Sequence, residues 1–169
     1  MVPEDRKQQG LILEMGIREN IGLPGLQRHC HWRTFVNAQR ERDDASHMTA
    51  EMRIKAAGDT QPVQFLSGGN QQKVVLGKWL SMKPRILLLD EPTRGVDIGA
   101  KQEIYRLMEE LAEQGVAILF VSSEMEEVIS MSDRTLVMHE GHITAELAKS
   151  DLSEEAIMQA ATGRQRKPA

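Results

Sequence analysis

Two adjacent carboxylates, Asp90 and Glu91, directly follow the wholly apolar run at residues 86–89. Such a run is typical of a strand covered on both faces, and carboxylates at its end are costly unless something uses them. Magnesium chemistry on a nucleotide needs such a pair, because one carboxylate holds the ion and the other orients or deprotonates the attacking water. This interpretation makes Asp90 the metal-side residue and Glu91 the general base. The alternative is that both carboxylates only end a strand at the surface.

A second group of chemically competent residues is Ser67-Gly68-Gly69-Asn70, which precedes an amphipathic helical pattern. A serine and two glycines at a helix start leave several backbone N–H groups able to point at an anion, and the helix dipole adds to that attraction. The alternative is an ordinary N-cap at Ser67, with glycines that only turn the chain. Taken alone, these residues favour the N-cap.

The second half of the chain predicts a strand–helix–strand unit that positions the carboxylates. Residues 86–89 form the first strand, an amphipathic helix over residues 100–113 follows, and residues 116–121 form a second buried strand. Short joins of this kind make the two strands parallel, with a right-handed crossover. Ligands bind beyond the carboxyl ends of such strands, where Asp90 and Glu91 stand.

The remaining patterns predict helices in the polar first half and a small α/β segment at the end. They comprise a helical stretch over residues 11–20 broken by Gly22 and Pro24, one or two helices over 32–54, a loop over 56–66, a short helix over 124–130, a hairpin of 135–138 and 143–145 around Glu140-Gly141, and an amphipathic helix over 153–161.

Composition argues against several classes of protein. The formal net charge of −4 argues against a nucleic-acid binder held by bulk charge, so no nucleic-acid partner is expected. The longest apolar run, residues 116–121, is far short of the roughly 20 residues that span a bilayer. A single cysteine excludes an internal disulfide framework. His29-Cys30-His31 has no fourth ligand at a zinc-like spacing, so no zinc site is predicted there.

Together, the two groups of residues resemble the nucleotide-binding domain of ABC ATPases. Residues 67–70 match the signature motif, residues 86–91 match Walker B and residues 95–97 match the D-loop. The chain is most similar to the second, C-terminal ABC domain of the tandem ATPases that energise bacterial importers of ribose, galactose, arabinose and xylose. Pro-Glu-Asp-Arg-Lys at residues 3–7 also carries that likeness, which extends from Val2 to about Gly163.

The resemblance implies an α/β fold that is part of a P-loop NTPase domain. Residues 1–81 would hold a Q-loop remnant and the helical signature subdomain, residues 82–163 the RecA-like half with Walker B, D-loop and switch, and residues 164–169 a tail. The first sheet and the P-loop are not expected within the chain. None of the 13 glycines fits Gly-x-x-x-x-Gly-Lys-Ser/Thr, since Gly77-Lys78 is followed by Trp79. We therefore expect a C-terminal portion of an ABC domain that starts near its Q-loop.

Three positions bear on the mechanism. Glu4 stands where most ABC domains have the Q-loop glutamine, and Asn70 ends the signature, as is normal for the sugar subgroup. Ser123 aligns with the switch histidine but cannot act as a cationic donor, so this domain's own Walker B site is expected to be weak. Ser123 with Glu126 also forms a capping-box pattern, and we favour that role.

ABC domains pair head to tail, so that each nucleotide lies between the P-loop of one domain and the signature of the other. The resemblance implies ATP and Mg²⁺ as cofactors, Asp90 at the metal and Glu91 as catalytic base. The implied nucleotide-binding residues are Ser67, Gly68, Gly69, Asn70, Asp97, Ser123 and Glu4. The intact signature would complete the companion domain's site in trans, so we expect Ser67 and Gly69 to matter more for turnover than Glu91.

The implied partners are a companion ABC nucleotide-binding domain, transmembrane permease subunits that dock near residues 11–32 and, indirectly, a periplasmic sugar-binding protein. The expected location is peripheral, on the cytoplasmic face of the bacterial inner membrane. The alternative is a truncated, non-catalytic ABC domain, an interaction module or pseudogene product unable to bind ATP alone. A DNA-repair ABC ATPase is disfavoured because no sustained heptads occur.

Overall fold

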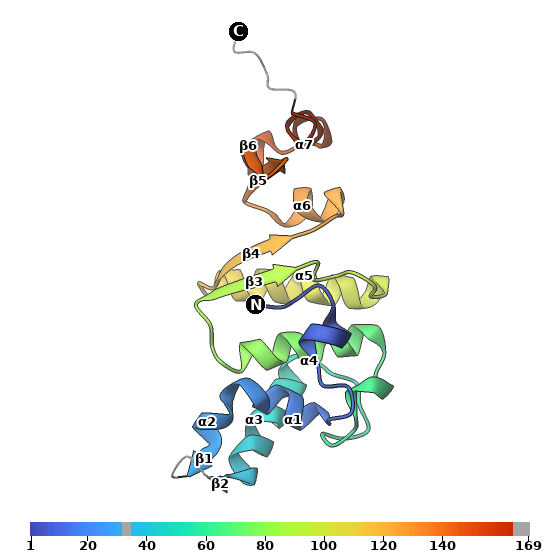
Figure 1. Ribbon diagram of the computed structural model, residues 1–169, viewed down its shortest axis with the longest axis vertical. Helices are drawn as coiled ribbons and strands as arrows, with labels where there is room; N and C mark the ends of the chain where they lie inside the picture. Colours follow the sequence, from blue (N-terminus) through green and yellow to red (C-terminus); the bar gives the residue numbers. More distant parts are fainter. Residues whose placement is uncertain (32–34, 164–169) are drawn as a thin grey trace. The chain divides into compact units, whose positions relative to one another are not determined.

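The computed structural model describes residues 1–31 and 35–163 (Figure 1). By their internal contacts the residues divide into two compact units, Met1–Val121 and Ser122–Ala169, and each is described by itself. The side chains of residues 29–31, 35 and 36 lie outside the description, and so does the His29-Cys30-His31 pattern.

The sheet of the first unit confirms the strand–helix–strand prediction. Strands β3 (Ile86–Asp90) and β4 (Ala117–Val121) are parallel, with Ile86 opposite Ala117 and Asp90 opposite Val121. Helix α5 (Ile98–Glu113) connects them and contacts β4. Gly115 ends the helical segment in the left-handed region at φ +87°, which glycine adopts without steric cost. Val2 pairs with the edge of β3, since its N–H donates to Leu88 O at 2.8 Å and its C=O accepts from Asp90 N at 3.0 Å.

The two strands are covered on one face only, so the prediction that both faces are buried is wrong. Leu87 is 2% exposed, whereas Leu88 is 40% and Ile86 is 65% exposed. On β4, Leu119 and Val121 are each 60% exposed. Alternate side chains of a strand point to opposite faces, so one face of the pair meets the helices while the other presents apolar side chains. An unbroken apolar run could not reveal this asymmetry.

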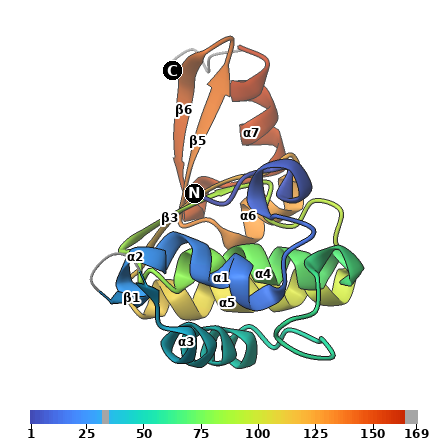
Figure 2. The ribbon, with the colours of Figure 1, turned by 60° about the horizontal axis from the view of Figure 1, so that its bottom comes forward.

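The helical part of the first unit consists of α1 (Ile17–Gly22), α2 (Leu26–His29), α3 (Ala38–Glu51) and α4 (Gly68–Leu80). Helix α1 contacts both α3 and α4, as Figure 2 shows, and Ile17, Ile21 and Leu76 are at most 1% exposed there. The helix predicted from residue 11 begins only at Ile17, because the side chain of Asn20 binds the preceding loop instead. The first unit also contains short elements that periodicity did not predict: a π-helical turn at Arg6–Gly10, 3₁₀ turns at Leu23–Gly25 and Val63–Phe65, and an antiparallel pair of strands, β1 (Cys30–His31) and β2 (Phe35–Val36).

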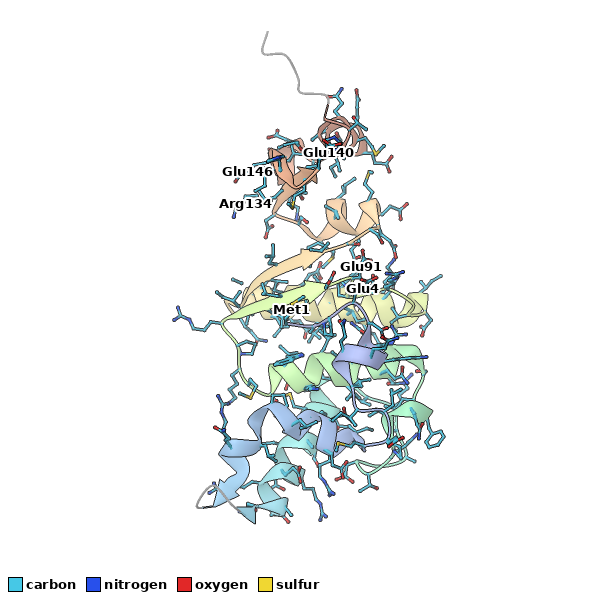
Figure 3. All side chains as sticks on the ribbon, viewed as in Figure 1. Met1, Glu4, Glu91, Arg134, Glu140 and Glu146 are labelled. Carbon is cyan, nitrogen blue, oxygen red and sulfur yellow. The ribbon has the colours of Figure 1, made fainter. Side chains whose placement is uncertain are left out.

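The second unit contains α6 (Met125–Met131), the hairpin of β5 (Arg134–His139) and β6 (His142–Ala148), and α7 (Glu154–Ala161), which confirms the predicted order. The hairpin turn has φ +47° at Glu140 and +80° at Gly141, the pattern of a type I′ turn. Arg134 and Glu146, labelled in Figure 3, form an ion pair of 2.7 Å across the hairpin.

The capping box predicted at Ser123 is wrong, because Glu124 occupies the N-cap position of α6. The neighbouring serine, Ser122, makes contacts with residues at the start of α6. Its Oγ accepts from Glu124 N at 3.0 Å and donates to the Glu127 carboxylate at 2.5 Å. The helix therefore starts one residue later than the capping-box pattern predicted.

Within residues 1–31 and 35–163, every helix is too short or too polar to span a bilayer.

Candidate functional site

Ser67 is the N-cap of helix α4, as one of the two interpretations of this segment predicts. Its Oγ accepts from Asn70 N at 3.4 Å and from Asn70 Nδ2 at 3.0 Å. The cap leaves anion binding open, since a helix start has four N–H groups without an intrahelical acceptor and a single hydroxyl satisfies only part of them. The first turn of α4, at Gly68 and Gly69, therefore remains a suitable place for an anion.

Asn70 ties the start of α4 to the loop after α3. Its Oδ1 accepts from Lys55 N at 2.9 Å while its Nδ2 donates to Ser67. Both ends of the amide are thus used within the protein, which fixes the orientation of the side chain.

The two glycines are required by close packing and not by an unusual backbone conformation. A β-carbon on Gly69 would lie 2.5 Å from the Cβ of Ala100, and one on Gly68 would lie 2.9 Å from Arg6 Nη2 and 3.1 Å from Gly95 O. Real β-carbons do not show a contact of 2.5 Å, so a larger residue at Gly69 would push α4 and α5 apart, whereas at Gly68 the Arg6 side chain and Gly95 O would have to shift by a smaller amount. The glycines let α4 begin directly against α5 and the loop before it.

Asp97 caps the neighbouring helix α5 in the same way, because its Oδ1 accepts from Ala100 N at 2.9 Å. Its Oδ2 would lie 3.4 Å from a β-carbon on Gly69, so the first turns of α4 and α5 adjoin. Each helix start carries a partial positive charge of roughly half a unit, and two adjacent starts favour a negatively charged ligand. The Asp97 carboxylate offsets part of that charge.

Asp90 and Glu91 stand at the carboxyl end of β3. Asp90 shares a face with the exposed Ile86 and Leu88 by strand alternation, so it belongs to the open face of the sheet. Glu91 has φ +48°, its N–H donates to Val121 O at 2.9 Å, and its C=O accepts from Arg94 N at 3.1 Å. A non-glycine residue in this region costs about 1–3 kcal/mol, and such strain clusters at functional sites.

Glu4 forms an ion pair with Arg94, in the loop between β3 and α5. Figure 3 labels Glu4 and Glu91, which come from the N-terminal segment and from the end of β3. The Glu4 side chain is 46% exposed and the Arg94 side chain 63% exposed, so this ion pair lies at the surface.

The structure thus gathers the segments of Glu4, residues 67–70 and Asp97 around the starts of α4 and α5, and Asp90 and Glu91 begin the loop that leads there. Ser123 belongs to the second unit, which is described by itself. In the described part of the chain, no three His, Cys, Asp or Glu side chains come together as a metal site.

Two contacts near the site escaped prediction from the sequence. Arg6 donates to the carbonyls of Arg94 and Gly95, which follow it by 88 and 89 residues. Lys73 on α4 is buried, donates to Arg53 O at 3.2 Å and forms an ion pair with Glu103 of α5. The hydrogen bond that Lys73 donates to the Glu103 carboxylate lowers the pKa of that carboxyl. The one signal in the sequence was the position of Lys73 directly before the apolar Val74-Val75-Leu76 of α4.

Comparison with known proteins gives a consistent result. A family model described as ABC transporter matches residues 1–94. The ribose import ATP-binding protein RbsA of Geobacillus kaustophilus is 55% identical over 163 residues, which cover 96% of this chain and 33% of that protein. RbsA 2 of Streptomyces avermitilis is 50% identical, with 97% of this chain and 32% of that protein covered. The chain therefore spans about a third of the length of these curated relatives.

Solved structures agree on the fold. A dimeric ATP-binding cassette in a post-hydrolysis state bound to ADP and Pi superposes with a TM-score of 0.72 at 24% identity, covering 85% of this chain and 60% of that one. An ABC transporter in an inward-facing conformation gives a TM-score of 0.75 at 18% identity, covering 90% of this chain and 60% of that one. At these identities the likeness shows a shared architecture, which confirms the predicted partial P-loop NTPase fold.

Proposed function

Because this chain belongs to the ABC transporter family, we propose that it forms part of an ATP-binding subunit that energises the import of a monosaccharide. Its signature segment at residues 67–70 would complete a nucleotide site on a companion domain. The observation that carries this proposal is the contact between Gly69 and Ala100, which sets the starts of α4 and α5 side by side as one anion-attracting surface. The names of the relatives, which are ribose import proteins, support a sugar as cargo.

The residues present fit a nucleotide phosphate. The start of α4 has backbone N–H groups without intrahelical acceptors, and the helix dipole there favours an anion such as a phosphate oxygen. When bound, ATP with Mg²⁺ supplies the phosphoryl group whose hydrolysis drives transport. Ser67, Gly68 and Gly69 would hold its oxygens, and Asp97 would support the start of the adjacent helix.

Asp90 and Glu91 would serve this domain's own nucleotide site. The Asp90 carboxylate offers the oxygen ligands that Mg²⁺ prefers, and the Glu91 carboxylate would accept the proton of the attacking water. Residues 1–169 contain no Gly-x-x-x-x-Gly-Lys-Ser/Thr segment, and Ser123 cannot act as a cationic donor. Both features favour weak activity at this domain's own nucleotide site. Turnover would then depend on the companion domain's site and on Ser67 in trans.

The proposed partners are the companion nucleotide-binding domain, transmembrane permease subunits and, indirectly, a periplasmic sugar-binding protein. The loop before α1 supports a permease contact because Ile12 is 42% and Met15 is 40% exposed there, as apolar side chains. Asn20, fully buried, fixes this loop by accepting from Ile12 N at 2.9 Å and donating to Ile12 O and Gly16 O at 3.0 Å. Such a subunit would lie on the cytoplasmic face of the inner membrane, as a peripheral protein.

A chimera tests the proposal. This chain replaces the matching third of RbsA from Geobacillus kaustophilus, and the hybrid is assembled with its permease in vesicles. We expect ATP-driven ribose uptake, a fall of about tenfold or more with Ser67→Ala, and a smaller fall with Glu91→Gln. Loss of uptake with Glu91→Gln but not with Ser67→Ala would contradict the assignment in trans.

A non-catalytic domain is the second candidate, favoured for the 169-residue chain alone by the missing phosphate-binding motif. Titration calorimetry of the 169-residue chain with ATP and Mg²⁺ tests this second candidate. We expect no binding at micromolar concentration by the isolated chain, and heat released at that concentration would show a phosphate cradle elsewhere in it. Failure of the chimera to transport would favour this second candidate.

A further inference from the structure

The Arg6 guanidinium bridges segments that are far apart in the sequence. Its Nη1 donates to Arg94 O at 2.8 Å and its Nη2 donates to Gly95 O at 3.1 Å. Arg6 Nη2 also lies 2.9 Å from the position of a β-carbon on Gly68. Arg6 Nε is buried and has no hydrogen-bond partner in the described part of the chain, so the side chain's hydrogen bonds go to these two carbonyls.

Hydrogen bonds hold the residues on both sides of Arg6 in place. Asp5 Oδ1 accepts from Lys7 N at 2.9 Å and from Gln8 N at 3.0 Å, which starts the turn of Arg6–Gly10. Lys78 Nζ of α4 then donates to Gly10 O at 2.9 Å. Upstream, Val2 pairs with the edge of β3. The Arg6 guanidinium therefore contacts the loop from a segment, residues 2–10, that is bound to both β3 and α4.

Local contacts also hold the loop that Arg6 contacts, because Arg94 pairs with Glu4 and its N–H donates to Glu91 O at 3.1 Å. Arg6 adds hydrogen bonds to the carbonyls of Arg94 and Gly95. Gly95 has φ +67°, a conformation that turns its carbonyl toward Arg6 and that other residues adopt at a cost. Two residues later Asp97 caps α5, and the start of α5 touches Gly69. A shift of residues 94–97 would therefore move the Asp97 carboxylate and the start of α5 relative to the first turn of α4.

We propose that Arg6 is a positioning residue that holds the loop at residues 94–97 against the first turn of α4 and so sets the geometry of the nucleotide site completed in trans. This inference rests on the proposed function, because it concerns the same site. Arginine suits the task because its planar fork offers two parallel donors, whereas lysine offers one point charge. Arg6 contacts no ligand in this role and acts through the backbone of Arg94 and Gly95.

The test uses the chimeric importer described above, with Arg6→Ala, Arg6→Lys and the control Arg85→Ala. Arg85 is an exposed arginine before β3.

Misplacement of catalytic groups by about 1 Å can cost roughly a hundredfold in rate. We expect kcat for ATP hydrolysis to fall about tenfold to a hundredfold with Arg6→Ala and less with Arg6→Lys. The KM for ATP should change less than about threefold, because the companion P-loop binds most of the nucleotide. Arg85→Ala should match the unsubstituted protein.

Three outcomes would overturn the inference, and they are distinguishable. If Ser67→Ala lowers kcat but Arg6→Ala does not, the proposed function stands and the positioning role is wrong. If Arg6→Ala lowers activity only in proportion to unfolded protein, measured by thermal melting of the same samples, the role is merely structural. If Ser67→Ala is also silent, the proposed function fails and the inference falls with it.

Discussion

Gly69 at the start of α4 lies directly against Ala100 at the start of α5, and a β-carbon on Gly69 would come within 2.5 Å of the Ala100 Cβ. This contact makes the two helix starts one surface. It also explains a glycine inside a helix, where glycine costs roughly 0.5–1 kcal/mol relative to alanine. The close approach requires the glycine even though the helix does not favour it.

Gly69→Ala should therefore destabilise the protein despite its better helix propensity. Overpacking costs about 1–3 kcal/mol, which exceeds the gain in propensity. Urea unfolding followed by tryptophan fluorescence measures the change. Gly58→Ala is the control, because a β-carbon there has nothing within 4 Å and the expected change is within about 0.5 kcal/mol. Combining Gly69→Ala with Ala100→Gly should restore most of the loss, and purely additive costs would show that the two residues do not interact.

Ser67 has a capping role and a proposed ligand role, which one pair of substitutions separates. Ser67→Ala removes the cap and should cost about 1 kcal/mol of unfolding free energy. Ser67→Asp keeps a capping oxygen, so stability should stay near that of the unsubstituted protein, while the added negative charge repels a phosphate. Urea unfolding and ATP hydrolysis by the assembled importer are the two measurements. Full hydrolysis by Ser67→Asp would argue against a phosphate at this turn.

The ion pair of Lys73 and Glu103 predicts a specific acid sensitivity. The hydrogen bond from Lys73 lowers the folded-state pKa of Glu103 below its ordinary value of 4.5. The stability that this pair contributes is therefore fully present above the unfolded pKa and is lost as pH falls through the folded pKa. Glu103→Gln should lower stability at pH 7 by about 1 kcal/mol, since the carboxylate is partly solvent-screened, and should flatten the decline of stability below about pH 5.

Unfolding free energies measured in urea between pH 3 and pH 7 test this dependence. Glu109→Gln, an exposed position on the same helix, serves as the matched control and should leave the slope unchanged. An identical acid slope in Glu103→Gln and the unsubstituted protein would mean that the pair does not titrate as inferred.

The two faces of β3 predict unequal costs for neighbouring substitutions in the 169-residue chain. Leu87 is 2% exposed, so Leu87→Ala should cost roughly 2–5 kcal/mol through lost transfer energy and a residual cavity. Leu88 is 40% exposed, so Leu88→Ala should cost about 1 kcal/mol. Urea unfolding of both variants makes the comparison. Equal costs would indicate that the second face is also covered.

The sequence predicted the elements that carry a clear local pattern. The apolar run at residues 86–89, the helix that Gly115 ends and the turn at Glu140-Gly141 each carry their own periodicity or turn chemistry, and the structure confirms them. Ser67 as an N-cap was also predictable, since a cap depends on residues within one turn. The short elements at residues 6–10, 30–31 and 35–36 were not, because a few residues carry no measurable period.

The sequence by itself thus determined the order of the elements, the parallel strand pair and the residue types of the candidate site, because hydrophobic period, caps and turns act over a few neighbouring residues. Only the tertiary structure decided that Arg6 meets Arg94 and Gly95, that Gly69 meets Ala100, and that β3 is covered on one face. These are contacts between segments far apart in the chain. Their geometry depends on how whole helices pack, and local patterns carry no record of that packing.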